Sequence, residues 1–169
     1  MLYPPTDILI SMQAELLNEF MMSHAAILQA FRAWFHAAHH VTRGTGFHAD
    51  HELYADIYSA VEGYYDIVIE KSIGILKCEH VASPHKVMKE ACIVLGAYPD
   101  PVGMTSLAIA TAAHKIMSDY SDFLNEMNKS LEDSGSITLG LDDFHASTAN
   151  AIETHIYKLG QRIKTELQD

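Results

Sequence analysis

The chain has 169 residues, of which 49% are hydrophobic, and a formal net charge of −11 at pH 7. This length and composition are typical of one domain, over residues 1–169, with a substantial apolar core. The negative charge and the lack of a Lys/Arg stripe disfavour direct DNA binding, because such a surface repels phosphate backbones.

Other features of the sequence concern its cellular environment. No run of about 18 apolar residues supports a membrane span. The N-terminal MLYPPTD lacks the basic segment of a secretory signal. Cys78 and Cys92 have no zinc-binding spacing and fit free thiols in a reducing compartment. We therefore expect a cytoplasmic protein with no membrane segment.

Apolar residues recur at spacings of three and four along most of the chain, which is the pattern of amphipathic helices. The first two long helices are separated by a short turn that contains Gly44 and Gly46, and a long connector from Lys77 to Pro101 follows them. A short helix is expected inside this connector, because Ser83-Pro84 is a helix-start signal. The predicted helices span residues 7–40, 48–75, 84–95, 103–132 and 142–167.

This order of helices predicts the fold class. Two long helices joined by a short turn, a long connection with a short helix, and two further long helices are typical of an all-α, ferritin-like four-helix bundle. No segment has the pattern of a strand or hairpin.

The second predicted helix has two distinct sides when its residues are placed at 100° intervals. The side expected to face the core carries Leu53, Ile57, Ala60, Tyr64, Ile67 and Val68. The opposite side carries His51, Ala55, Glu62, Asp66, Ile69 and Glu70, bordered by Tyr58, Tyr65 and Ile73. Because this second side is half apolar, we expect it to pack against a surface that does not belong to its own bundle.

The usual di-iron site inside a ferritin-like bundle is disfavoured. Such sites use Glu-x-x-His pairs on two helices. No glutamate in this chain has a histidine three residues after it, and Glu153 is followed by His155 at the wrong spacing.

A different metal site is indicated by the stretch HHVTRGTGFHADHELYADIYSAVEGYYDIVIE. His39 and His51 flank the turn, and Asp66 and Glu70 lie one helical turn apart further along. The fifteen residues from His51 to Asp66 span about 22 Å of helix, so one metal ion cannot bind both within a single chain.

Two copies of the chain resolve this difficulty. If two such helices cross antiparallel near Tyr58 to Glu62, the histidine end of one meets the carboxylate end of the other. The two-fold axis then generates two equivalent sites. Imidazole and carboxylate ligands with open positions suit iron, and zinc and manganese are alternatives.

This stretch resembles the signature of the Dps family, the DNA-protection-during-starvation mini-ferritins. The family's His-x11-His and Asp-x3-Glu motifs match His39, His51, Asp66 and Glu70 without a gap. The resemblance implies that these four residues are the catalytic iron ligands of a hollow homododecamer. Such a shell oxidises Fe(II) with peroxide or oxygen at its two-fold interfaces, stores the iron and acts against oxidative stress.

The chain also departs from the family pattern. An acidic ligand usually stands four residues after the second histidine, where this chain has Ala55. Glu52, Asp56 and Glu62 are nearby, and only Glu62 shares the face of His51, which makes it a further candidate metal ligand. The Trp that commonly follows the first histidine is replaced by His40, and the basic N-terminal tail of some members is absent.

The sequence therefore leaves two functional hypotheses. The first is an iron-oxidising mini-ferritin, with full or impaired activity. The alternative is a non-catalytic assembly protein that keeps the shell but has lost iron oxidation. Six other histidines are interpreted as having no part in the metal site. They are His36 and His40, polar residues at a helix end, and His24, His114, His145 and His155, unconnected positions on several helices.

Overall fold

This computed structural model describes residues 6–166, which form five α-helices and one short 3-10 helix joined by turns and loops. They are α1 (Thr6–Val41), α2 (Phe47–Leu76), the 3-10 helix η1 (Glu79–Ala82), α3 (Pro84–Leu95), α4 (Ser106–Asp133) and α5 (Leu139–Glu166). The sequence did not predict η1, because four residues carry too little periodicity. The end predicted for the last helix, residue 167, lies outside the described residues.

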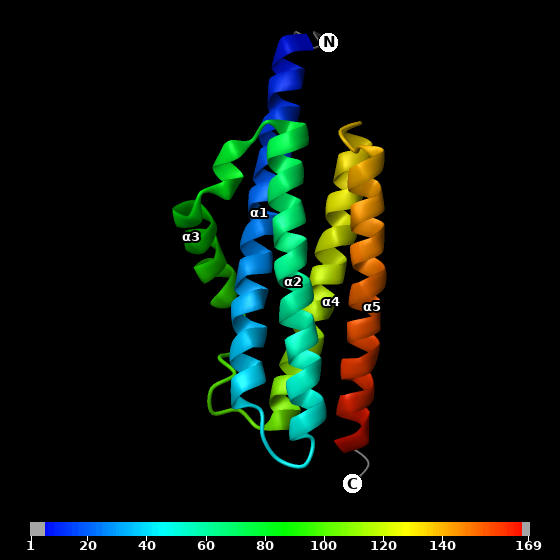
Figure 1. Cartoon of the computed structure of the whole chain (residues 1–169). Coiled ribbons are helices and arrows are strands. Elements are labelled where there is room, and N and C mark those ends of the chain that lie inside the picture. Colours follow the sequence, from blue (N-terminus) through cyan, green and yellow to red (C-terminus); the bar gives the residue numbers. More distant parts are fainter. Residues whose placement is uncertain (1–5, 167–169) are drawn as a thin grey trace.

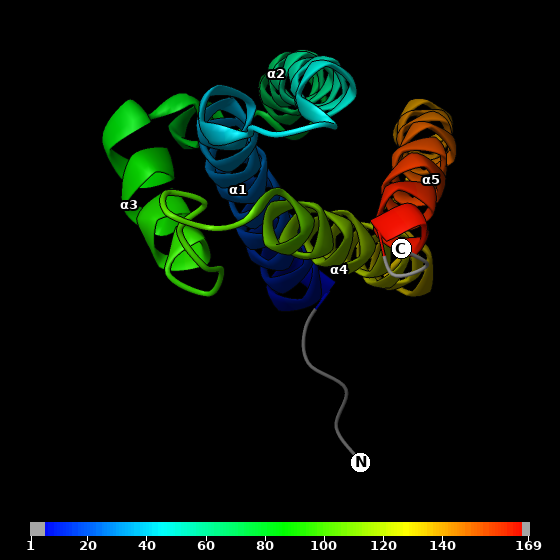
Figure 2. The ribbon, with the colours of Figure 1, turned by 90° about the horizontal axis from the view of Figure 1, so that it is seen from below.

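The four long helices form a bundle with one long crossover. α1 and α2 are antiparallel neighbours, and so are α4 and α5 (Figure 1). Since α2 and α4 run in the same direction, the chain has to return along the bundle between them. It does so through η1 and α3, and the view along the bundle shows α3 on the outer side of α1 (Figure 2). The predicted ferritin-like four-helix bundle is confirmed.

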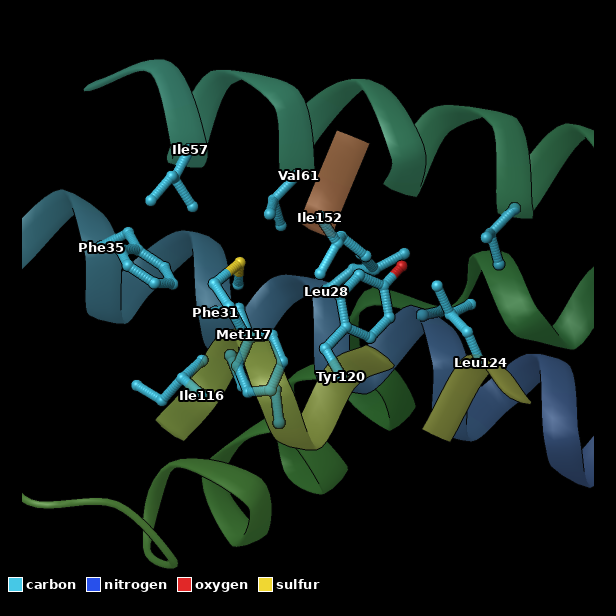
Figure 3. Close-up of a cluster of buried hydrophobic side chains, with 14 of the residues drawn as sticks. Leu28, Phe31, Phe35, Ile57, Val61, Ile116, Met117, Tyr120, Leu124 and Ile152 are labelled. Carbon is cyan, nitrogen blue, oxygen red and sulfur yellow. The ribbon is translucent and has the colours of Figure 1, made fainter. Parts of the chain in front are cut away.

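Apolar side chains from the four long helices meet in the middle of the bundle (Figure 3). Each helix contributes residues at helical spacing, which is why the periodicity in the sequence identifies them. Burying each large apolar side chain contributes about 1.5–3 kcal/mol to folding. The buried cluster includes Leu28, Phe31 and Phe35 of α1, Ile57 and Val61 of α2, Ile116, Met117, Tyr120 and Leu124 of α4, and Ile152 of α5.

The core face of α2 is rotated relative to the prediction. Ile57 and Val68 are fully buried as expected, but Tyr54 and Val61 are buried with them, at 0% and 2% exposure. Ile67 was expected in the core and is 37% exposed. The other expected core residues, Leu53, Ala60 and Tyr64, are half-buried. Apolar residues cover more than half of the circumference of α2, so contact with its neighbours decides which of them are buried.

No helix among residues 6–166 is both long enough and apolar enough to cross a membrane. Cys78 is buried and Cys92 is exposed, and both are free thiols.

Candidate functional site

A tight turn brings the end of α1 against the start of α2. Gly44 has a φ of +91°, a left-handed conformation that residues with a Cβ rarely adopt. The amide of Phe47 donates to the carbonyl of Gly44 at 3.0 Å, and the amide of Asp50 donates to the carbonyl of Gly46 at 2.9 Å. These bonds close the turn and start α2 with its first residues beside the last turn of α1.

The turn places His39 and His51 in direct contact. Nδ1 of His39 donates to the backbone carbonyl of His51 at 2.8 Å. Nδ1 of His51 donates to the carbonyl of His39 at 2.9 Å. The two rings are stacked, with centroids 3.6 Å apart and an angle of 24° between their planes. The two histidines that the sequence predicted to act together thus hold each other in place.

These reciprocal bonds determine which ring atoms face outward. A carbonyl oxygen can only accept, so each Nδ1 carries the proton, and in the neutral ring Nε2 keeps its lone pair. Within residues 6–166, neither Nε2 forms a hydrogen bond. The carbonyl of His39 lies in the last turn of α1, where helix carbonyls lack an intrahelical donor. A histidine whose Nδ1 donates to a carbonyl and whose Nε2 is free has the arrangement of a metal ligand.

An ion pair holds the first turn of α2 to the end of α5. Arg162 donates from Nε to Oδ1 of Asp50 at 2.7 Å and from Nη2 to Oδ2 at 3.1 Å. The Asp50 side chain is only 1% exposed. This bond fixes the turn of α2 next to His51, and the sequence did not reveal it because the partners are 112 residues apart.

The carboxylates predicted to complete the site lie elsewhere on α2. Asp66 and Glu70 are exposed, and neither forms a hydrogen bond or ion pair within the described part of the chain. They follow His51 by fifteen and nineteen residues on one straight helix, so they cannot reach it in the same chain. Accordingly, no group of three or more potential metal ligands gathers within residues 6–166.

The acidic residues nearer to His51 have other contacts. Glu62 accepts from Nε of Arg32, and its Oε1 lies 3.0 Å from Nη2 of the same residue. Oε1 of Glu52 lies 3.3 Å from Nε2 of His48. Ala55 stands one turn after His51 and is half-buried. The structure thus brings His39 and His51 together and leaves Asp66, Glu70 and Glu62 separate from them.

The interior of the bundle contains histidines for which the sequence gave no role. Nε2 of His24 hydrogen-bonds with the hydroxyl of Tyr120 at 2.8 Å, and Nδ1 of His145 with Oδ1 of Asn128 at 2.9 Å. Burial, and secondarily the nearby His145, lowers the pKa of His24 to about 3. Burial likewise lowers the pKa of His145 to about 4. Both rings are therefore neutral core residues at neutral pH.

Comparison by sequence identifies no relative of this chain. No known family model matches it, and no curated protein matches it either.

Comparison by structure, in contrast, finds solved Dps proteins. Dps from Thermosynechococcus elongatus is similar with a TM-score of 0.77 and 18% identity, over 90% of this chain and 93% of that chain. A Dps protein from Bacillus brevis has a TM-score of 0.77 and 14% identity, over 89% and 97%. Antigen TpF1 from Treponema pallidum has a TM-score of 0.76 and 17% identity, over 96% and 97%. At these identities the likeness shows the fold, and it confirms the resemblance to Dps at that level.

Proposed function

We propose that this chain is a Dps-like mini-ferritin that oxidises Fe(II) at inter-subunit two-fold sites and stores iron inside a homododecameric shell. The observation that carries the proposal is the pair of reciprocal hydrogen bonds between His39 and His51. These bonds orient two imidazoles and leave both Nε2 atoms without a hydrogen bond. Histidines that were only exposed to solvent on a helix face would not require this fixed orientation. The Dps-type fold of the chain supports the same proposal.

The carboxylates come from a second copy of the chain. His51 and Asp66 lie on the same side of α2, too far apart for one ion, so an antiparallel crossing of two α2 helices is the arrangement that joins them. In this mechanism Nε2 of His39 and of His51 bind Fe(II), and Asp66 and Glu70 of the second copy neutralise its charge. Each Fe(II) gives one electron, so two Fe(II) ions and two protons reduce one hydrogen peroxide to two water molecules. Four Fe(II) ions and four protons reduce one oxygen molecule to two water molecules.

The alternative function is a ferritin-like assembly protein without iron oxidation. Ala55 favours it, because the position one turn after His51 offers no carboxylate. Glu62, the nearby acidic residue on the same face, is paired with Arg32. Binding at this site would then rely on two imidazoles and the second copy's carboxylates alone.

Aerobic oxidation of Fe(II) separates the two functions. Metal-free protein is mixed with Fe(II), with and without peroxide, and ferric iron is followed by its ultraviolet absorbance. We expect the wild-type chain to accelerate oxidation over buffer and His51→Ala to lose most of that acceleration. His85→Ala, which removes an exposed histidine on α3, is the matched control. A wild-type rate equal to that of buffer supports the non-catalytic assembly protein.

A further inference from the structure

Two other histidines lie on the exposed side of α1, one helical turn apart. Nε2 of His36 and Nε2 of His40 are 3.3 Å from each other. Their rings are nearly perpendicular, with centroids 4.7 Å apart and an angle of 80° between the planes. Tyr58 of α2 packs edge-on against His36, with centroids 5.1 Å apart. Both histidines are exposed, so a dissolved ion can reach them.

The separation of the two nitrogens suits a shared metal ion. At 3.3 Å the two nitrogens can share a hydrogen bond, in which one neutral ring donates and the other accepts. Two nitrogens that each lie about 2.0–2.1 Å from a tetrahedral zinc ion are about 3.3–3.4 Å apart. Histidines at positions i and i+4 of a helix present their rings on one face, which is how helical zinc sites pair them.

The local charge also favours a cation. His40 lies in the last turn of α1, the end of the helix at which the helix dipole carries partial negative charge. Of the two arginines near this pair, Arg32, one turn before His36, is paired with Glu62, and Arg43, three residues after His40, is exposed to solvent. The chain as a whole carries a net charge of −11. The end of the helix and the net charge of the chain therefore both favour a cation at this position.

We propose that His36 and His40 form a second binding site, for a borderline divalent transition-metal ion such as Zn²⁺, with water in the remaining positions. Two neutral imidazoles prefer such ions to Mg²⁺ or Ca²⁺. The site uses other ring nitrogens than the pair formed by His39 and His51, whose Nδ1 atoms bond to each other's backbone, and it lies next to that pair, with the ring centroids of His39 and His40 4.9 Å apart. It does not depend on a second copy of the chain or on iron oxidation, and it gives these histidines a role beyond that of polar helix-end residues.

Zinc titration of metal-free protein tests the proposal. The background is the double variant His39→Ala/His51→Ala, in which the other pair is removed. We expect calorimetry to show that this background binds one Zn²⁺ per chain. Either additional substitution, His36→Ala or His40→Ala, should weaken Zn²⁺ binding by about tenfold or more. The ion then has one imidazole ligand in place of two ligands held on the same helix. Adding His85→Ala is the control and should leave the affinity unchanged.

A spectroscopic measurement identifies the ligands independently of affinity. Cu²⁺ bound to the same background should show electron paramagnetic resonance couplings from two imidazole nitrogens, falling to one in the His36→Ala variant. If the background binds no Zn²⁺, or if neither added alanine changes the affinity, the proposal is overturned. A second titration does not require the double variant to fold. The single variant His36→Ala should bind one Zn²⁺ per chain fewer than the wild-type chain. Failure of iron oxidation alone would count only against the proposed function.

Discussion

We expect the residue one helical turn after His51 to limit the chemistry that the candidate iron site can perform. Ala55 is half-buried on the same side of α2 as His51 and supplies no negative charge. An added carboxylate here would lie one turn from an imidazole whose Nδ1 is already held by the carbonyl of His39. Since carboxylates bind iron well and stabilise its ferric state, the missing acid is expected to limit the rate.

We therefore predict that Ala55→Asp raises the initial rate of Fe(II) oxidation by about tenfold, equivalent to about 1.4 kcal/mol of barrier. The rate is measured by stopped-flow absorbance in the presence of peroxide. Ala146→Asp adds the same charge at an exposed position of α5 and should leave the rate at the wild-type value. Equal rates in wild type and Ala55→Asp would show that this position is not part of the iron site.

A second prediction at this scale concerns His24, which is 0% exposed and has a pKa of about 3 in place of the ordinary 6.5. Below pH 6.5 the unfolded chain takes up a proton on this ring, whereas the folded chain does not until near pH 3. Its contribution to stability is therefore complete above about pH 6.5 and is lost as the pH falls toward 3. At pH 5 the loss from this one ring amounts to about 2 kcal/mol.

The measurement is the free energy of unfolding in urea at several pH values between 7 and 4.5. His24→Phe should flatten this dependence, even though loss of the hydrogen bond to Tyr120 lowers stability at every pH. His85→Ala, which removes an exposed histidine, serves as the control. A slope in His24→Phe as steep as in the wild type would rule out proton uptake at this ring as the cause.

At the scale of the helices, the bond between Asp50 and Arg162 connects the start of α2 with the end of α5. Arg162→Met removes the cation and leaves the Asp50 carboxylate buried without it. Breaking a buried pair in this way costs about 3–5 kcal/mol. We expect the free energy of unfolding in urea to fall by this amount. Lys129→Met breaks an exposed pair with Asp133 and should leave the free energy of unfolding almost unchanged.

The same scale shows what the sequence can and cannot predict. Helix positions follow from apolar periodicity, and the contact of His39 with His51 follows from the short turn that joins their helices. The orientation of α2 does not follow, because Tyr54 and Ile67 lie on different parts of a broad apolar surface and only contact with other helices selects the buried one. The bond from Arg162 to Asp50 joins distant parts of the chain, and no local pattern indicates it.

At the scale of the whole molecule, the outer side of α2 is suited to meet a second copy of itself. Ala55, Ser59 and Gly63 lie four residues apart on this side, and a Cβ added at Gly63 would meet nothing within 4 Å. Small residues at this spacing let two helices approach closely. They lie near the midpoint between His51 and Asp66, which is where two antiparallel α2 helices must cross to bring those residues together.

This crossing leads to a test of the assembly. Ser59 is exposed in the single chain, so Ser59→Arg should fold with nearly unchanged stability. At the crossing, however, two long charged side chains would be forced together across the two-fold axis. We expect native mass spectrometry to show a dodecamer for the wild type and dissociated species for Ser59→Arg. The rate of Fe(II) oxidation should fall at least about tenfold in Ser59→Arg, because the histidines and carboxylates no longer meet. Ala82→Arg, at an exposed position of η1, should keep the wild-type mass and rate. An intact dodecamer with full activity in Ser59→Arg would place the two-fold contact elsewhere on the molecule.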